Sequence, residues 1–289
     1  MTLQPRLSEC ISEQFDGRYT YFLCQRLFAE SEAASLLTQF PTSEIEALRR
    51  PEVSHATLSS LRHPELVKSF LQWSPDWNTV YDWFTSEEFV ADVLTTFRSQ
   101  IKAKYPPIIR TLFSKWIMNP SRYYGEVQFS LRLTGSVLSP HTDNADKVLA
   151  LIVYFPDVGE TSTGGGTSFY LPRSKRSEFS VFNRYIRFGW LIPLGLRRLQ
   201  SAKLPTVDSF NASQEVGEHL EFFDRHYRRA FDAPYQLGAA GGFIKNQYSW
   251  HDLRLDDVAP GMIRRSLLVN VFLRPSRARA LVNRIFTRR

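Results

Sequence analysis

The sequence predicts a mainly β core that is supported by N-terminal helices. Up to about residue 121 the chain carries helix signals, and from about Gly125 the pattern changes to an alternation with period two. Strand-like runs then recur as far as Leu273. The 289 residues are 43% hydrophobic and 22% charged, which is typical of a globular chain that can bury a sizeable core. We expect a single domain over residues 1–289, with helical support over 1–121 and a β core over 122–274.

The N-terminal helices are predicted from their start signals. Pro64 occupies a first-turn position, and Ser86 precedes two glutamates, as expected at a helix start. The predicted helices cover residues 30–40, 63–73 and 86–104.

The strands of the core are predicted from their faces. Residues 126–133 alternate between an apolar face (Val127, Phe129, Leu131, Leu133) and a polar face (Glu126, Gln128, Ser130, Arg132). A polar face on such a strand indicates the lining of a pocket. Residues 147–155 are apolar on both faces, as in a central strand, and residues 264–273 complete the set.

A basic and aromatic segment, residues 173–237, interrupts the strands. Its second half, 216–231, has the apolar spacing of a helix. We expect this insertion to form a lid or to select the substrate, because such segments often carry specificity. The candidate substrate contacts are Trp190, Arg197 and Arg198.

The net charge of +7 is concentrated at the C-terminus. Six arginines and no acidic residues lie between Arg274 and Arg289, so the rest of the chain is nearly neutral. This distribution argues against a nucleic-acid-binding protein. The basic tail, residues 275–289, is expected either as a solvated terminal helix or as a contact to an anionic membrane surface or an acidic partner.

Localisation is predicted from what the sequence lacks. It contains no run of about 18 apolar residues and no secretory signal, so we expect a cytoplasmic protein without a transmembrane segment. Cys10 and Cys24 have neither a disulfide framework nor a zinc-finger spacing. The oligomeric state is left open.

Three of the six histidines begin a His-x-acid triplet, at His63, His141 and His219. Side chains at i and i+2 share a face on extended backbone but point apart on a helix. His63 and His219 lie in predicted helices, whereas His141 and Asp143 follow a strand and Pro140 favours extended geometry before it. Only His141 and Asp143 are therefore expected to chelate one cation.

His251 is the expected third ligand. It follows Gly241-Gly242-Phe243, which we expect to lead into a strand beside the core. Two imidazoles and one carboxylate with open positions suit ferrous iron that must also bind a cosubstrate and oxygen.

The last strand is expected to bind a carboxylate. Alternation places Arg264, Ser266 and Asn270 toward the polar pocket, beside Gln128, Ser130 and Arg132. The fork of Arg264 can grip a carboxylate through two parallel hydrogen bonds, and Ser266 can add a third.

Taken in order, these residues resemble the iron(II) and 2-oxoglutarate-dependent dioxygenases, in particular the prolyl-hydroxylase-like branch. The resemblance covers about residues 122–274. It rests on Gly135, His141-Thr-Asp143, Tyr154-Phe-Pro, Gly164-Gly-Gly-Thr-Ser-Phe169, Gly242-Phe, Trp250-His251 and Arg264-x-Ser266.

The resemblance implies a double-stranded β-helix, a jelly-roll core flanked by N-terminal helices. It further implies that His141, Asp143 and His251 bind Fe(II) and that Arg264 holds the distal carboxylate of 2-oxoglutarate. The implied reaction consumes O2, with ascorbate as an optional reductant, and releases succinate and CO2 while an unactivated C–H bond is hydroxylated. The substrate is a small molecule or a protein side chain.

Two departures from the family pattern limit the assignment. A tyrosine that this branch often carries nine residues before the first iron-binding histidine is Arg132 here. The spacing from His251 to Arg264 is longer than in the shortest members, so Arg265 and Arg254 stay as alternatives. Because Asp143 is present, the open halide position of related halogenases is not expected.

Two other functions stay open. The first is a metal-dependent enzyme of the same fold that does not use 2-oxoglutarate. The second is a non-catalytic jelly-roll binding protein that acts through the insertion and the basic tail.

Overall fold

The structure is a computed structural model that describes most of the chain. Trp190, Arg197, Arg198 and the basic tail lie outside the described residues. The described residues are 3–15, 19–51, 53–105, 107–134, 137–144, 146–157, 164–185, 204, 214–246, 248–255 and 261–274.

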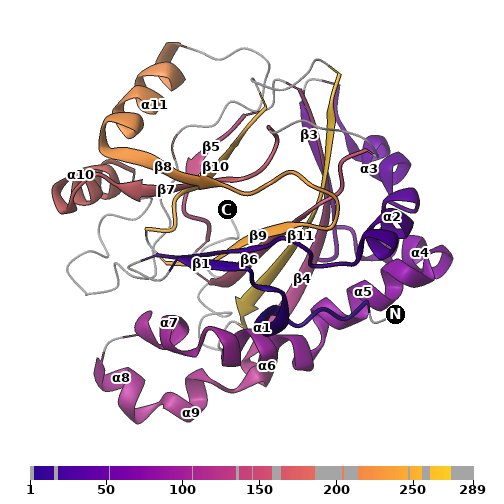
Figure 1. Ribbon diagram of the computed structural model, residues 1–289, viewed down its shortest axis with the longest axis horizontal. Coiled ribbons are helices and arrows are strands. Elements are labelled where there is room, and N and C mark those ends of the chain that lie inside the picture. Colours follow the sequence, from indigo (N-terminus) through magenta and orange to yellow (C-terminus); the bar gives the residue numbers. More distant parts are fainter. Residues whose placement is uncertain are drawn as a thin grey trace, which may run out of the picture.

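Two antiparallel sheets form the core (Figure 1). The larger sheet has the order β1-β2-β9-β6-β11-β4-β3 and the smaller sheet the order β5-β10-β7-β8. From β4 to β11 the chain passes back and forth between the two sheets, which is the connectivity of a jelly roll and confirms the predicted fold class. The strands are β1 (Glu13–Phe15), β2 (Thr20–Cys24), β3 (His55–Ser59), β4 (Tyr123–Leu133), β5 (Val137–His141), β6 (Lys147–Tyr154), β7 (Ser168–Pro172), β8 (Tyr227–Asp232), β9 (Ala240–Ile244), β10 (His251–Arg254) and β11 (Ile263–Leu273).

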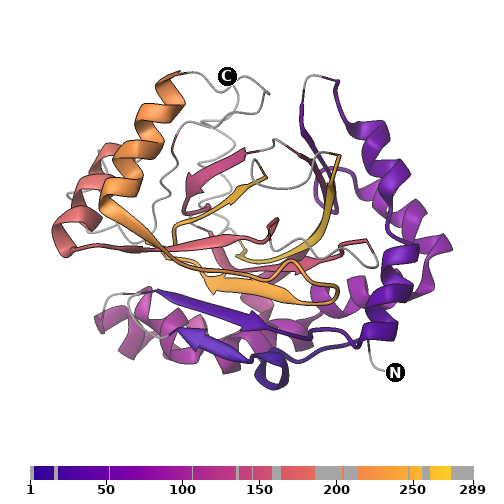
Figure 2. The same ribbon diagram turned by 45° about the horizontal axis from the view of Figure 1, so that its top comes forward.

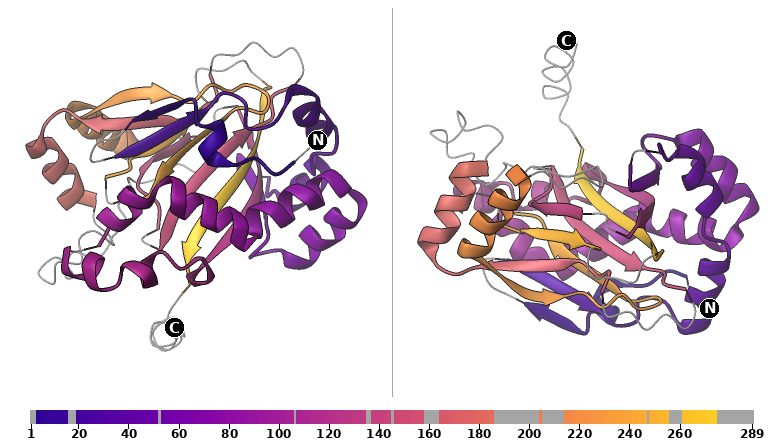
Figure 3. Two further views of the ribbon diagram at one scale, coloured as in Figure 1. Left: turned by 60° about the horizontal axis from the view of Figure 1, so that its bottom comes forward. Right: turned by 90° about the horizontal axis from the view of Figure 1, so that it is seen from above.

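The N-terminal helices support the larger sheet on one side (Figure 3). They are α1 (Leu7–Cys10), α2 (Glu30–Thr38), α3 (Thr42–Leu48), α4 (Pro64–Trp73), α5 (Pro75–Thr85), α6 (Glu87–Thr96), α7 (Arg98–Ala103), α8 (Pro107–Leu112), α9 (Ser114–Ile117) and the 3-10 turn η1 (Pro120–Arg122). On the side away from α2–α5, α10 (Lys175–Tyr185) and α11 (Gln214–His226) lie beside the smaller sheet (Figure 2). No helix in the described ranges is both long and apolar enough to cross a membrane.

The alternation of β4 sets both of its faces as predicted. Val127, Phe129 and Leu131 are buried against the helices, where the ring of Trp77 lies 4.9 Å from that of Phe129. The polar side chains of β4 therefore point to the other face, toward the space between the sheets. A second apolar cluster fills part of that space and includes Ile152, Tyr154, Phe169 and Phe243.

Three strands lie in the part that was expected to be mainly helical. β2 pairs with β9 and β3 pairs with β4, so the N-terminal part extends the larger sheet at both edges. All five residues of β2 are buried, because its two faces contact the helices and the interior between the sheets. Such a strand lacks the alternation by which half-buried strands are detected.

The single helix that was expected over 86–104 is two helices. α6 ends at Thr96 and α7 begins at Arg98, with Phe97 between them at φ −109° and ψ 31°. The ring of Phe97 is fully buried, with its centroid 4.9 Å from that of Phe22 on β2. We attribute the break to this contact with Phe22, which cannot be predicted from the residues around Phe97.

The helix that was expected over 216–231 ends early. α11 stops at His226, and residues 227–232 form β8, which pairs with β7. Tyr227 still stacks on Phe223, with ring centroids 4.8 Å apart, which explains why the helical spacing continued past the true end. The last part of the presumed insertion thus belongs to the smaller sheet. Likewise, Gly241 and Gly242 lie within β9 and not in a turn before it.

Gly125 is required by a close approach between β4 and the end of α5. A Cβ at this position would lie 2.1 Å from the carbonyl oxygen of Phe84. We expect Gly125→Ala to lower the free energy of unfolding by about 3 kcal/mol, because a backbone must move to admit the methyl group. Gly217→Ala on α11 is the control. It meets no atom within 4 Å and should raise stability by about 0.5 to 1 kcal/mol in the same urea titration.

Candidate metal centre

His141 and His251 are brought together by the pairing of β5 with β10. The two residues are direct partners in this antiparallel register, and their ring centroids lie 4.2 Å apart. His141 is the last residue of β5 and His251 is the first residue of β10. The site thus lies at one end of the smaller sheet.

Both imidazoles are oriented by the same backbone contact. Nδ1 of His141 lies 3.0 Å from the carbonyl oxygen of Ser139, and Nδ1 of His251 lies 3.0 Å from that of Ser249. A carbonyl can only accept, so each Nδ1 donates, and in a neutral imidazole the lone pair is then on Nε2. This contact at Nδ1 leaves Nε2 for a metal ion, and metal-binding histidines are held by such a contact at their other ring nitrogen.

Asp143 completes the set from the segment that follows β5. Its backbone has φ 60°, and it is the one non-glycine residue with positive φ in the described part of the chain. Aspartate tolerates this left-handed conformation better than most residues, and such conformations concentrate at functional sites. The turn directs the carboxylate at both imidazoles.

The three side chains have the spacing of a metal site. Oδ1 of Asp143 lies 3.6 Å from Nε2 of His141, and Oδ2 lies 3.7 Å from Nε2 of His251. The three ligand atoms lie within 4.8 Å of one another. Ligand atoms bound about 2.1 Å from one ion lie about 3 to 4 Å apart, so the set fits a divalent cation. The predicted triad is therefore assembled in the fold, whereas His63 and His219 begin or lie within helices.

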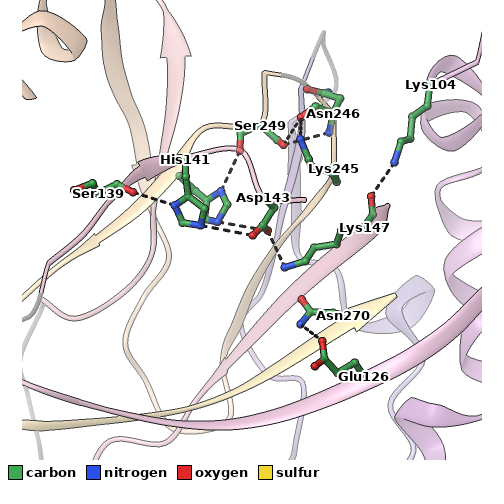
Figure 4. Close-up of polar contacts among 11 residues, drawn as sticks. Lys104, Glu126, Ser139, His141, Asp143, Lys147, Lys245, Asn246, Ser249 and Asn270 are labelled. Atoms are coloured by element: carbon green, nitrogen blue, oxygen red, sulfur yellow. Dashed lines mark hydrogen bonds and ion pairs between the residues drawn. The ribbon is translucent and has the colours of Figure 1, made fainter. Parts of the chain in front are cut away.

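Lys147 supplies a positive charge to the carboxylate. Its Nζ lies 2.9 Å from Oδ2 of Asp143, and Lys104 in turn donates to the carbonyl oxygen of Lys147 (Figure 4). Burial on its own would raise the pKa of Asp143, but Lys147 and the two imidazoles outweigh it and hold this pKa well below its usual value. Asp143 is therefore an anion at neutral pH, as a metal ligand must be.

His251 is held neutral. Burial, followed by the neighbouring His141, lowers the pKa of His251 to about 3. The ring of Phe243 lies 4.3 Å from the imidazole ring, and that of Phe169 lies 6.5 Å from it. These rings remove water from one side of the ligand, so His251 can offer a lone pair across the neutral pH range.

Arg264 lies inside the core, on the interior face of β11. The residue is 3% exposed, and its guanidinium donates to the carbonyl oxygen of Gly165 and to Oγ of Ser266, the latter at 3.0 Å. The guanidinium carbon lies 5.2 Å from the ring centroid of Tyr154 and 6.0 Å from that of Tyr235. None of these contacts within the described residues is a carboxylate. A buried cation without an anion is costly, so this position is suited to an anionic ligand.

The two alternatives to Arg264 differ in their surroundings. Arg265 lies on the opposite face of β11, and its Nη1 lies 2.7 Å from Oδ1 of Asp157 at the surface. The side chain of Arg254 lies outside the described residues. Of the two arginines whose side chains are described, Arg264 alone reaches the interior.

The other predicted pocket residues are arranged along the same two strands. Ser266 lies opposite Ser130, Arg264 opposite Arg132, and Leu268 opposite Gln128. Ser130 and Ser266 are fully buried near the arginine. Asn270 lies farther along β11 and donates to Oε2 of Glu126 at 3.3 Å. The strands therefore bring Ser266 to Arg264 and Ser130 opposite Ser266, whereas Asn270 belongs to a separate polar pair (Figure 4).

Tyr154 was not selected as a site residue from the sequence. Its hydroxyl accepts a hydrogen bond from the backbone N–H of Thr167 at 3.1 Å, and its ring packs beside Arg264. Burial raises the pKa of Tyr154, so the phenol stays protonated. The available signal was its position: with Ala150 and Ile152 it lies on the alternate residues of β6 that face the interior.

Comparisons with known proteins find similar architectures only. No family model and no curated protein sequence matches the chain. Among solved structures, a prolyl-4-hydroxylase from Pseudomonas putida shares 10% identity at TM-score 0.40 and covers 89% of this chain and 93% of its own. The epimerase SnoN, in complex with Fe3+, alpha ketoglutarate and nogalamycin RO, shares 11% identity at TM-score 0.43, with 89% and 82% covered. EvdO2 from Micromonospora carbonacea var. aurantiaca, complexed with 2-oxoglutarate, shares 11% at TM-score 0.41, with 89% and 87% covered.

Proposed function

We propose that this chain is an Fe(II)- and 2-oxoglutarate-dependent dioxygenase that hydroxylates an unactivated C–H bond and releases succinate and CO2. The observation that carries the proposal is the pairing of two sites in one interior. His141, Asp143 and His251 lie close enough together to hold one metal ion, and Arg264 is a buried cation that lacks an anion among the described residues. A metal site alone would fit many enzymes, but the buried arginine adds a specific requirement for a carboxylate.

The interior face of β6 connects the two sites. Ala150 lies opposite Phe243, whose ring contacts His251, and Tyr154 lies opposite Ser266, which accepts from Arg264. A short dicarboxylate could bind the metal with one end and reach Arg264, Ser266 and Tyr154 with the other. We infer that the hydroxyl of Tyr154 donates a hydrogen bond to the same distal carboxylate.

The protein's own residues prepare the site for this chemistry. The carbonyl oxygens of Ser139 and Ser249 hold the histidine tautomers, and Lys147 keeps the aspartate ionised. His141, Asp143 and His251 would hold the cation, which would keep further positions for a cosubstrate. Bound iron would supply the activation of dioxygen that no side chain can provide. The substrate, a small molecule or a protein side chain, would bind over the open side.

Anaerobic titration tests the proposal. The apo protein is mixed with Fe(II) and then with 2-oxoglutarate, and the visible charge-transfer band of an iron-bound 2-oxo acid is recorded. We expect a band only when both are present. Iron binding without a band would instead support the metal-dependent enzyme that does not use 2-oxoglutarate. A folded protein that binds no iron would support the non-catalytic binding protein.

A further inference from the structure

An apolar surface lies on α8 and α9, at the edge of the molecule opposite to β5 and β10 (Figure 1). The α8–α9 surface consists of Ile108, Leu112, Phe113 and Trp116, which are 72%, 71%, 48% and 49% exposed. Large apolar side chains are common singly on surfaces, but four within nine residues form a patch that requires an explanation.

The chain segment that carries this patch is basic, and the one acidic neighbour that acts on it from another segment at Lys104 is Asp146. Between Asp92 and Glu126 the chain has six basic residues and no acidic residue. Arg98 and Lys115 are exposed, and the guanidinium carbon of Arg122 lies 3.0 Å from the centroid of the Trp116 ring. Apolar and aromatic side chains among lysines and arginines are the composition of segments that lie in a membrane interface.

The basic tail starts beside the same surface. Arg274, the last described residue, donates its backbone N–H to the carbonyl oxygen of Arg122 at 2.7 Å and its Nε to that of Tyr123 at 3.0 Å. The five arginines of residues 275–289 follow directly in the sequence. The described chain therefore ends beside the α8–α9 surface, and the arginines that follow Arg274 in the sequence would add positive charge for the same partner.

We propose that the α8–α9 surface docks the protein onto an anionic lipid membrane. Burial of aliphatic and aromatic side chains at the acyl boundary and attraction to anionic headgroups would add in this arrangement. A second copy of the chain is disfavoured, because a symmetric contact would bring two surfaces of the same charge together. A nucleic acid would neutralise the charge but would not bury Ile108 and Leu112.

Vesicle sedimentation with the full chain tests this docking. The vesicles are phosphatidylcholine alone and an equal mixture of phosphatidylcholine and phosphatidylserine. We expect binding to the mixed vesicles that weakens as salt is raised, and little binding to phosphatidylcholine alone. The double variant Leu112→Ser/Trp116→Ser and the charge reversal Lys115→Glu should each lower the partition coefficient by about tenfold.

Trp73→Ser is the matched control. Trp73 on α4 is 85% exposed, so its loss removes more exposed apolar surface than that of Trp116, but it lies outside the positive patch. Its binding should equal that of the wild type. The proposal is overturned if the mixed vesicles are not bound, or if Trp73→Ser weakens binding as much as the double variant. It is also overturned if the double variant abolishes self-association of the free chain and leaves vesicle binding unchanged.

Discussion

Replacing Asp143 with asparagine is expected to lower the affinity for Fe(II) by at least about 100-fold and to abolish succinate release, because even the partners of metal ligands contribute about 10- to 100-fold. The variant keeps the size of the side chain, and asparagine also tolerates the left-handed backbone found at φ 60°. The amide oxygen can still accept from Lys147. What is lost is the negative charge that the cation site has beside the two imidazoles. Anaerobic calorimetric titration with Fe(II) measures the change.

Asp157→Asn is the control for the loss of a carboxylate. Asp157 pairs with Arg265 at the surface, and its side chain is 66% exposed. Removing that pair should change neither iron affinity nor turnover, since exposed ion pairs contribute little. If Asp143→Asn binds iron as tightly as the wild type, then the carboxylate is not a ligand and the assignment of the triad is wrong.

The placement of His141 beside Asp143 could be predicted because it is encoded locally. His141 and Asp143 are two residues apart in extended chain, and that spacing distinguishes them from the triplets at His63 and His219, which the structure places in helical surroundings. The two faces of β4 and of β11 could also be predicted, because apolar and polar residues alternate along both strands. Local patterns are therefore sufficient where one face of a strand meets a core and the other meets a pocket.

The features that escaped prediction depend on partners far away in sequence. Phe97 breaks a helix because it packs on Phe22, and β2 has no alternation because both of its faces are covered. Lys147 is the charge partner of Asp143 only because the turn after β5 takes a left-handed residue. Tyr154 meets Arg264 only through the register of β6 with β11. None of these contacts is visible until the sheets are assembled.

Replacing Arg264 with methionine is expected to raise the concentration of 2-oxoglutarate needed for half-maximal turnover by roughly 30-fold or more, because truncating one partner of a buried charged pair costs about 2 to 5 kcal/mol. Iron affinity in the absence of 2-oxoglutarate should be unchanged, since the guanidinium contacts Gly165 and Ser266 and not the triad. The apo variant should be at least as stable as the wild type, because an unpaired cation is removed from the core. Thermal unfolding without ligands checks this last point.

Two further variants separate carboxylate binding from packing. Arg264→Lys keeps the charge but loses the fork, so it should restore part of the 2-oxoglutarate affinity. Arg265→Met removes a neighbouring arginine whose partner is Asp157, and it should bind 2-oxoglutarate as the wild type does. If Arg265→Met is the variant that loses 2-oxoglutarate affinity while Arg264→Met retains it, the carboxylate lies on the other face of β11. In that case 2-oxoglutarate does not bind along the interior face of β6. The buried guanidinium of Arg264 then serves only to join Gly165 to Ser266.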